Sequence, residues 1–187
     1  SALGGWREAD GGDGRMTVRG MNVLPVAGAL GAVIAGVEWS LGLEAGKAAD
    51  IRQVFLQHKV IFWRQQKLTP QQCLDFAKAM GEPIEYPFVK GLEGFAQIIE
   101  VKKLEHEKVN FGGIWHSDTT YLEVPPMGSM LLSLAVAPYA RDTLFANHCL
   151  AYESLSATMT NMPAGLVVIT HSATAYRSTT REERTKS

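Results

Sequence analysis

Apolar residues recur along the chain with spacings that distinguish helices from strands. The segment 44–57 predicts an amphipathic helix, because its apolar positions return every three or four residues and form one stripe. That stripe consists of Ala48, Ile51, Val54 and Phe55. A stripe of this kind indicates a helix that packs one face on a core and exposes the other.

A second helix is predicted immediately after Thr69, where several local signals coincide. Thr69 is a capping residue, Pro70 suits the first helical turn, and Gln72 completes a capping box with Thr69. Gly81 follows the last turn, as glycine commonly does at a helix end. The predicted inner face is Leu74, Ala77 and Met80.

Short apolar runs predict strands in the rest of the chain. Residues 60–63 form a β-branched and aromatic run typical of a buried strand. Residues 26–37 are apolar but contain three glycines and are too short to cross a bilayer, so they predict paired strands around a turn. Further strands are predicted at 96–101, 127–136, 142–147 and 166–170, with helical turns at 150–155 and 157–162.

These elements indicate a mainly β fold with flanking helices, such as a sandwich or barrel. Residues 1–15 are rich in glycine and predict a flexible leader. Residues 16–187 are then expected to form a single domain, because a chain of 187 residues suits one hydrophobic core better than two.

Composition excludes some classes of partner. The net charge is −1 and no basic run stands out, so binding to nucleic acid is not expected. No segment is long and apolar enough for a membrane span, and a cytoplasmic location is expected. Cys73 and Cys149 lie far apart without C-x-x-C spacing, so we expect both to be apolar packing residues in a reducing compartment.

The strongest candidate for chemistry is the H-x-D pair His116 and Asp118. On a strand, residues i and i+2 point to the same face, so the two side chains are expected to converge. An imidazole and a carboxylate are two of the three protein ligands of a non-haem iron(II) oxygenase site. An isolated H-x-D is weak evidence, because a local surface hydrogen bond explains most such tripeptides.

The residues around this pair strengthen the metal interpretation. Residues 110–121, 125–128, 142–147 and 151–156 resemble, in order and spacing, the taurine dioxygenase-like family of Fe(II)/2-oxoglutarate-dependent dioxygenases. Upstream, residues 25–36, 60–64 and 68–83 are similar to that family's opening strands and first long helix. The resemblance runs from about Val23 to Ala173, and it implies a double-stranded β-helix, the jelly roll of cupin-like proteins.

The resemblance also implies a reaction and its participants. His116 and Asp118 would bind Fe(II), and Thr143 would contact a carboxylate of the co-substrate 2-oxoglutarate. With O₂, such an enzyme hydroxylates a small organic acid or sulfonate-like substrate and releases succinate and CO₂. Thr143 is also an ordinary β-branched strand residue, and Ala140-Arg141 replaces the Gly-Gly turn that the family usually has before it.

The substrate pocket is predicted at Tyr86, Phe111 and Gly112. Family members that accept taurine present a His and an Asn to the sulfonate, and those places fall near Tyr86 and Gly112 here. Since both polar partners are absent, taurine is disfavoured and a less polar or aromatic substrate is expected beside Tyr86, Phe88 and Phe111. The alternative role for these aromatic side chains is core packing.

Two parts of the family pattern are not found in the chain. They are the second His that completes the metal site and the Arg that pairs with 2-oxoglutarate, so the jelly roll is expected to lack its C-terminal strands and this chain alone to be inactive. His171 matches a family position that is not a ligand, and a buried, hydrogen-bonded structural role is expected for it. His148 is expected in a first turn or a loop.

Other functions therefore remain open at this point. The chain could be a truncated or degenerate, catalytically silent jelly-roll module, or a metal-dependent protein that is not an oxygenase. A homo-oligomer is also left open. The third metal ligand and the identity of the substrate are not determined by the sequence.

Overall fold

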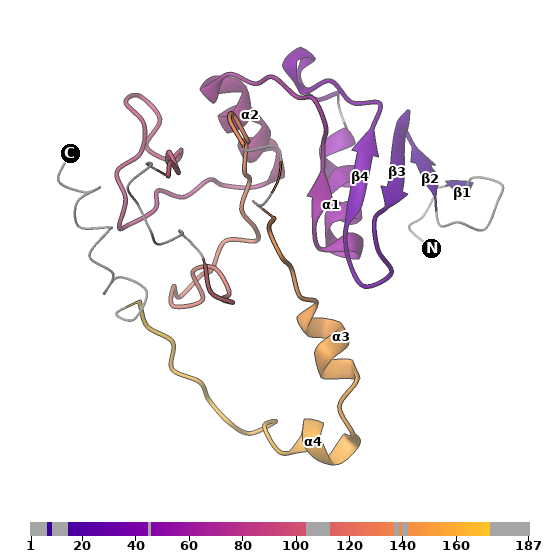
Figure 1. Cartoon of the computed structure of the whole chain (residues 1–187), viewed down its shortest axis with the longest axis vertical. Helices are drawn as coiled ribbons and strands as arrows, with labels where there is room; N and C mark the ends of the chain where they lie inside the picture. The colour runs from indigo at the N-terminus through magenta and orange to yellow at the C-terminus, as the bar shows by residue number, and fades with distance from the viewer. Residues whose placement is uncertain are drawn as a thin grey trace. The chain divides into compact units, whose positions relative to one another are not determined.

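The computed structural model describes residues 7–8, 15–44, 46–103, 113–136, 139 and 142–172 (Figure 1). The chain divides into two units. The first comprises Ser1–Met80 and Leu132–Gly165, and the second comprises Gly81–Leu131 and Leu166–Ser187. All named strands and helices belong to the first unit, whereas the H-x-D pair belongs to the second.

The first unit contains a five-stranded sheet whose strands lie in sequence order. The strands are β1 (Arg7–Glu8), β2 (Met16–Val18), β3 (Met21–Pro25), β4 (Ala32–Ala35) and β5 (Ile61–Phe62). The first four pair antiparallel, and β5 pairs parallel to β4. Strand β1 lies inside the segment predicted as a leader, so part of that segment extends the sheet.

The β3–β4 hairpin carries the alternation expected of a half-buried sheet. Val23 pairs with Ile34, and both are buried, whereas the neighbouring Asn22 is exposed. The Val26 N–H donates to the Gly31 carbonyl at 2.9 Å and closes the turn. The predicted pair of strands is therefore present, but its first strand precedes residue 26 and only β4 lies within 26–37.

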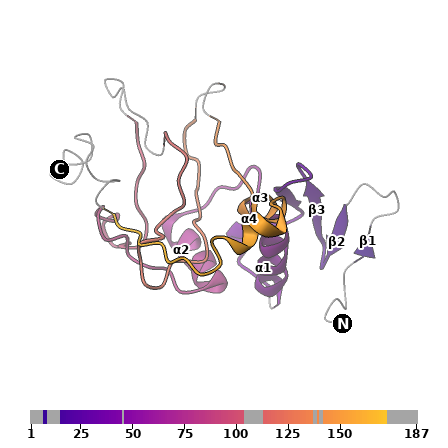
Figure 2. The same cartoon turned by 90° about the horizontal axis from the view of Figure 1, so that it is seen from below.

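Helix α1 (Lys47–His58) connects β4 to β5 and permits their parallel pairing. Ile51 and Val54 of the predicted stripe are buried, and α1 packs beside the sheet (Figure 2). The predicted helix is confirmed, although it begins at Lys47 rather than at residue 44. Gly46 precedes it in a left-handed conformation with φ of 86°, which ends the preceding loop.

Helix α2 (Pro70–Met80) begins with the predicted capping box. The Thr69 N–H donates to Gln72 Oε1 at 2.8 Å, and the Gln72 N–H donates to Thr69 Oγ1 at 3.3 Å. Its one buried side chain among the described residues is Phe76, which the sequence prediction omitted from the inner face. The predicted residues Leu74, Ala77 and Met80 are only half-buried, because the face that packs on the core contains Phe76, which lies about 100° around the helix from Ala77.

Phe76 belongs to an aromatic cluster that joins three elements of the first unit. Trp39, in the short helix η1 (Trp39–Leu41), lies 4.9 Å from Trp63 and 4.4 Å from Phe76 between ring centroids, both edge to face. The Trp39 N–H donates to Gln66 Oε1 at 3.0 Å, and Gln66 Nε2 donates to the Val37 carbonyl at 3.1 Å. The Gln66 side-chain amide therefore binds the backbone at Val37 and at Trp39, and so fixes the segment that places Trp39 in the core.

Several predicted strands are absent. Segments 96–101, 127–136, 142–147 and 166–170 contain no strand, although each is apolar. A strand exists only where a neighbour completes its backbone hydrogen bonds, and these segments have no such ladder within the described residues. Their apolar side chains are accordingly exposed, as with Leu134 at 84%, Leu144 at 71% and Val167 at 90%.

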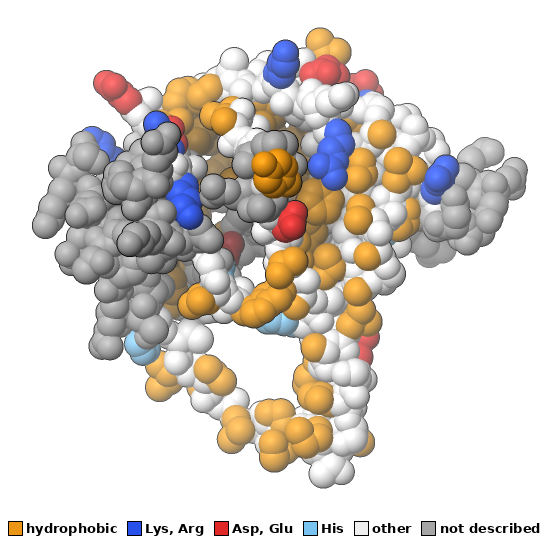
Figure 3. All heavy atoms as spheres, in the orientation of Figure 1, with side chains coloured by type: hydrophobic (Ala, Val, Ile, Leu, Met, Phe, Trp, Pro, Cys, Tyr) orange, Lys and Arg blue, Asp and Glu red, His pale blue; other side chains and the backbone are white. Residues whose placement is uncertain are grey.

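The two predicted helical turns are confirmed as α3 (His148–Glu153) and α4 (Ala157–Asn161). Asn147 caps α3 by accepting from the backbone N–H groups of Cys149 and Leu150, and Ser156 caps α4. Neither helix has a buried residue, and apolar side chains lie on the surface of this segment (Figure 3). His148 begins α3, as expected.

The coarse prediction of strands with flanking helices is confirmed, whereas the jelly roll stays a prediction.

Both cysteines are free thiols. Cys73 is half-buried in α2, and burial raises the pKa of its thiol, but Cys149 is exposed and does not pack as predicted. Within the described residues, no helix combines the length and apolar content that a bilayer crossing requires.

Replacing Gly36 with alanine should destabilise the sheet. Gly36 has φ of 82°, and an added Cβ would lie 2.6 Å from the Gly20 carbonyl oxygen, so the substitution forces two backbone segments apart. We expect a loss of about 2–4 kcal/mol in the free energy of unfolding, measured by urea denaturation. Gly42 is the matched control, with φ of 83° and no described atom within 4 Å of an added Cβ. Its alanine variant should lose only about 1 kcal/mol, and equal losses would contradict the clash.

His58 at the end of α1 should make stability depend on pH. Burial first, and then the neighbouring Lys59 charge, lower the pKa of His58 below its ordinary value of 6.5. As pH falls below that value, the unfolded chain binds a proton that the native imidazole binds less readily, so the free energy of unfolding decreases. Well above pH 6.5 the imidazole is neutral in both the folded and the unfolded chain, so His58 causes no such decrease there. A His58→Gln variant should show a weaker decline between pH 7 and pH 5 in urea midpoints, and an unchanged decline would contradict this assignment.

Candidate metal centre

The H-x-D pair lies in a loop rather than on the strand that the sequence predicted. Residues 113–117 form no regular element, and a turn follows in which the Leu122 N–H donates to the Thr119 carbonyl at 3.1 Å. Thr119 has φ of 50°, an uncommon conformation for a β-branched residue. The backbone therefore reverses directly after Asp118, which a continuous strand would not do.

The His116 side chain is oriented by a backbone carbonyl. Its Nδ1 lies 2.7 Å from the Ile114 carbonyl oxygen, and because that oxygen only accepts, Nδ1 carries the hydrogen and donates. In the neutral tautomer that has its hydrogen on Nδ1, the ring presents the lone pair of Nε2 away from Ile114. This arrangement of one donated hydrogen bond and one available nitrogen is common among metal-binding histidines.

The two side chains converge as predicted, although through a loop. His116 Nε2 lies 3.1 Å from Asp118 Oδ1. Two adjacent ligand atoms around a metal with bonds of about 2.1 Å are roughly 3 Å apart, so this separation suits neighbouring coordination positions. A protonated imidazole would instead donate to the carboxylate, so a proton and a metal compete for Nε2. Both side chains are accessible, at 50% and 60% exposure.

A further contact reaches the other carboxylate oxygen. Ser129 Oγ donates to Asp118 Oδ2 at 3.2 Å. Thr170 Oγ1 donates to the Thr120 carbonyl at 2.7 Å and holds the backbone of the following turn. Sequence reasoning did not single out Ser129; the only signal was its position directly after the Pro-Pro-Met-Gly segment at 125–128.

Among the described residues, no group of three His, Cys, Asp or Glu side chains could hold a metal ion. His171 is exposed rather than buried, which corrects the structural role expected for it. Residues 166–171 are exposed throughout, so no described element packs over this part of the chain.

The other predicted site residues are distributed differently. Thr143 is exposed and belongs to the first unit, in an extended segment where Phe145 lies 6.5 Å from Phe62 between ring centroids. Its role toward 2-oxoglutarate stays a prediction. Phe111 and Gly112 of the predicted substrate pocket, together with Ala140 and Arg141, lie outside the described residues.

Tyr86 lies in an aromatic row of the second unit. The Tyr86 and Phe88 ring centroids are 6.1 Å apart, and those of Phe88 and Tyr121 are 5.9 Å apart, all edge to face. Tyr121 follows Asp118 within the same turn. The row therefore connects the predicted substrate residue Tyr86 to the loop that carries the H-x-D pair.

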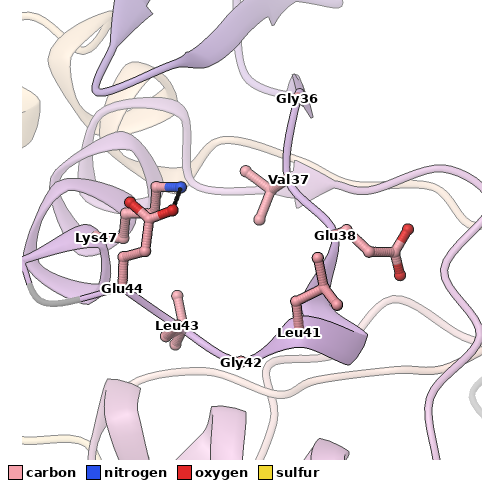
Figure 4. A pocket seen from close by; sticks show the side chains of 8 residues that line it. All are labelled: Gly36, Val37, Glu38, Leu41, Gly42, Leu43, Glu44 and Lys47. Atoms are coloured by element: carbon pink, nitrogen blue, oxygen red, sulfur yellow. Dashed lines mark ion pairs between the residues drawn. The ribbon is translucent and has the colours of Figure 1, made fainter.

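Two surface pockets of the first unit do not include the H-x-D pair. One, of about 310 Å³, is lined by residues 36–38, 41–44 and Lys47, and the Lys47 Nζ contacts Glu44 Oε1 at 3.0 Å on its rim (Figure 4). The other, of about 340 Å³, is lined by residues 66–69 and 132–134. Neither brings together groups for the predicted chemistry.

Residues 22–187 match the family described as taurine catabolism dioxygenase TauD, TfdA family. The chain is 36% identical over 136 residues to an alpha-ketoglutarate-dependent sulfate ester dioxygenase of Pseudomonas putida, covering 72% of the chain and 44% of that relative. It is 31% identical over 145 residues to an alkylsulfatase of Acinetobacter baylyi, covering 77% of the chain and 45% of that relative.

A more distant relative is an (S)-phenoxypropionate/alpha-ketoglutarate-dioxygenase of Delftia acidovorans, 28% identical, with 72% of the chain and 49% of that relative covered. Among solved structures, a taurine dioxygenase from Burkholderia xenovorans matches with a TM-score of 0.69 and 31% identity, over 78% of the chain and 52% of that structure. The chain thus spans about half the length of the relatives that it matches.

Proposed function

The chain belongs to the taurine catabolism dioxygenase TauD, TfdA family, and on this premise we propose that it is an Fe(II)- and 2-oxoglutarate-dependent dioxygenase. His116 and Asp118 bind the metal in this proposal. The observation that carries it is the 3.1 Å approach of His116 Nε2 to Asp118 Oδ1, with Nδ1 held by the Ile114 carbonyl. The relatives named as alpha-ketoglutarate-dependent dioxygenases support the same co-substrate, which is 2-oxoglutarate.

The protein's own residues have distinct tasks in this proposal. His116 Nε2 and Asp118 Oδ1 would hold Fe(II), and the Ile114 carbonyl would keep the imidazole in the tautomer that leaves Nε2 free to bind it. Fe(II), once bound with 2-oxoglutarate and O₂, would supply the oxidising power for hydroxylation of a substrate, with succinate and CO₂ as the co-products. The Thr143 hydroxyl is proposed to donate to a 2-oxoglutarate carboxylate.

The proposed fold is the jelly roll, with residues 16–187 forming one domain of this type. The TM-score of 0.69 to a taurine dioxygenase over 78% of the chain supports it. A cytoplasmic location and a homo-oligomer stay predictions.

The proposed substrate is a small organic acid or sulfonate-like compound. The names of the relatives point to sulfate esters, alkyl sulfates and phenoxypropionate, and each of these compounds joins an anionic group to an organic body. The row of Tyr86, Phe88 and Tyr121 offers aromatic surface for such a body in the same unit as His116 and Asp118. These contacts favour an organic group larger than that of taurine.

The test is an anaerobic titration of Fe(II) into the purified chain, with and without 2-oxoglutarate, followed by calorimetry and visible absorbance. We expect one Fe(II) per chain, held weakly because two protein ligands are proposed, and a visible band that requires 2-oxoglutarate. A folded chain that binds no Fe(II) would overturn the metal site. Metal binding without the band would favour the silent module, and substrate-dependent succinate release from a longer form would establish the dioxygenase.

A further inference from the structure

We propose that Ser129 is a positioning residue for Asp118, and that its hydroxyl selects which carboxylate oxygen faces the metal. The proposal rests on the metal-binding function proposed for His116 and Asp118. Ser129 has no role in the resemblance described above, and its assignment comes from the contacts of the second unit alone.

The two oxygens of Asp118 have different partners. Oδ2 accepts from Ser129 Oγ at 3.2 Å, whereas Oδ1 lies 3.1 Å from His116 Nε2. An ionised carboxylate only accepts hydrogen bonds, so the serine hydroxyl is the donor and its hydrogen points to Oδ2. With a metal between His116 Nε2 and Oδ1, both oxygens would be held at once, and this would fix the rotation of the carboxylate about its Cβ–Cγ bond.

Asp118 benefits from such a restraint because its surroundings leave it free to move. Its side chain is 60% exposed, and the next residue begins a turn with a left-handed Thr119. An exposed aspartate samples several rotamers, and only one of them binds the metal. The apparent metal affinity therefore falls in proportion to the time that the side chain spends in the other rotamers. The Ser129 hydroxyl, by donating to Oδ2, reduces the time that Asp118 spends in rotamers that do not bind the metal.

The same hydrogen bond also disfavours bidentate binding. A carboxylate that binds a metal through both oxygens occupies two coordination positions, whereas binding through Oδ1 alone leaves a position open. With Ser129 donating to Oδ2, a bidentate arrangement would lose or weaken that hydrogen bond. Ser129 therefore favours a single Asp118–metal bond and open positions for co-substrate.

The position of Ser129 is itself restrained by its chain neighbours. Pro125 and Pro126 fix two φ angles shortly before it, which reduces the conformations available to the segment. Residues 113–131 all belong to the second unit, so the contact between Ser129 and Asp118 does not depend on the placement of the first. The pair is separated by 11 positions in sequence.

The experiment compares Co(II) binding by the chain and by four variants, since the visible bands of Co(II) report coordination number and geometry. Affinity is measured by competition with a chelator, and folding is checked by circular dichroism. Outer partners of metal ligands typically contribute 10–100-fold to affinity, and for this exposed contact we expect Ser129→Ala to weaken Co(II) binding by about 3–10-fold. Its bands should shift toward higher coordination as Asp118 becomes bidentate.

Two controls separate positioning from a general effect. Ser129→Thr retains the hydroxyl and should restore most of the affinity and the original bands. Ser133→Ala removes an exposed serine of the first unit and should bind Co(II) as the unaltered chain does. If Ser129→Ala matches the unaltered chain in affinity and bands while His116→Ala loses the metal, the positioning role is wrong but the metal site stands. If the unaltered chain binds no Co(II) or Fe(II), the proposed function itself fails and the positioning role with it.

Discussion

Replacing His116 with alanine should abolish metal binding, with a loss in Fe(II) affinity of about 100-fold or more. The expected loss exceeds the 10–100-fold typical of outer partners because a bond to the metal is removed. The Nε2 atom that approaches Asp118 Oδ1 at 3.1 Å would be absent, leaving one proposed protein ligand in an exposed loop. Anaerobic calorimetry of the variant beside the unaltered chain measures the effect, with thermal unfolding as the check on folding.

Other histidines provide matched controls for this variant. His148 begins α3 in the first unit, and His148→Ala should leave Fe(II) affinity unchanged. His171 is exposed in the second unit, so His171→Ala tests whether it acts as a further ligand. We expect no effect there either. An undiminished affinity in His116→Ala would contradict the metal site, and a loss in His171→Ala alone would relocate it.

Replacing Trp39 with alanine should have the largest effect on stability, about 3–5 kcal/mol in the free energy of unfolding. Trp39 is 6% exposed and contacts the rings of both Trp63 and Phe76, so its removal leaves a cavity between η1, α2 and the strand β5 region. The surrounding side chains close such a cavity only partly, because interiors are tightly packed. Urea denaturation followed by far-ultraviolet circular dichroism measures the loss without relying on tryptophan fluorescence.

Trp115 is the matched control, since it is the same residue type at 68% exposure. Trp115→Ala should change the free energy of unfolding by less than about 0.5 kcal/mol. Trp39→Phe retains an aromatic ring and should recover much of the loss. A Trp39→Ala variant as stable as the Trp115→Ala variant would show that the aromatic cluster contributes little to the stability of the first unit.

The proposed dioxygenase and the silent module share the metal loop and differ in co-substrate. A carboxylate held through one oxygen leaves positions open for 2-oxoglutarate, and this is the property assigned to Ser129. A visible band that requires 2-oxoglutarate would therefore distinguish the dioxygenase from the silent module. The metal titration alone tests the metal site of His116 and Asp118, which both interpretations share. Succinate release then tests turnover.

Local signals in the sequence were sufficient for helices α1 to α4 and for the H-x-D pair. The capping box of Thr69 and Gln72 involves residues three positions apart, so its geometry follows once the helix begins. The stripe of α1 is similarly local, with Ile51 and Val54 buried as predicted. His116 and Asp118 are separated by one residue, and they converge even though the expected strand is replaced by a loop.

Only the tertiary structure decided the features that depend on distant neighbours. The apolar segments 127–136 and 166–170 are not strands, because a strand requires a partner that no local pattern specifies. Phe76, rather than its neighbours on α2, is buried because Trp39 and Trp63 lie against it. The contact of Ser129 with Asp118 likewise depends on the turn that brings them together. Short-range hydrogen bonds and helical periodicity are encoded within a few residues, whereas sheet pairing and side-chain contacts across a loop depend on how the rest of the chain folds.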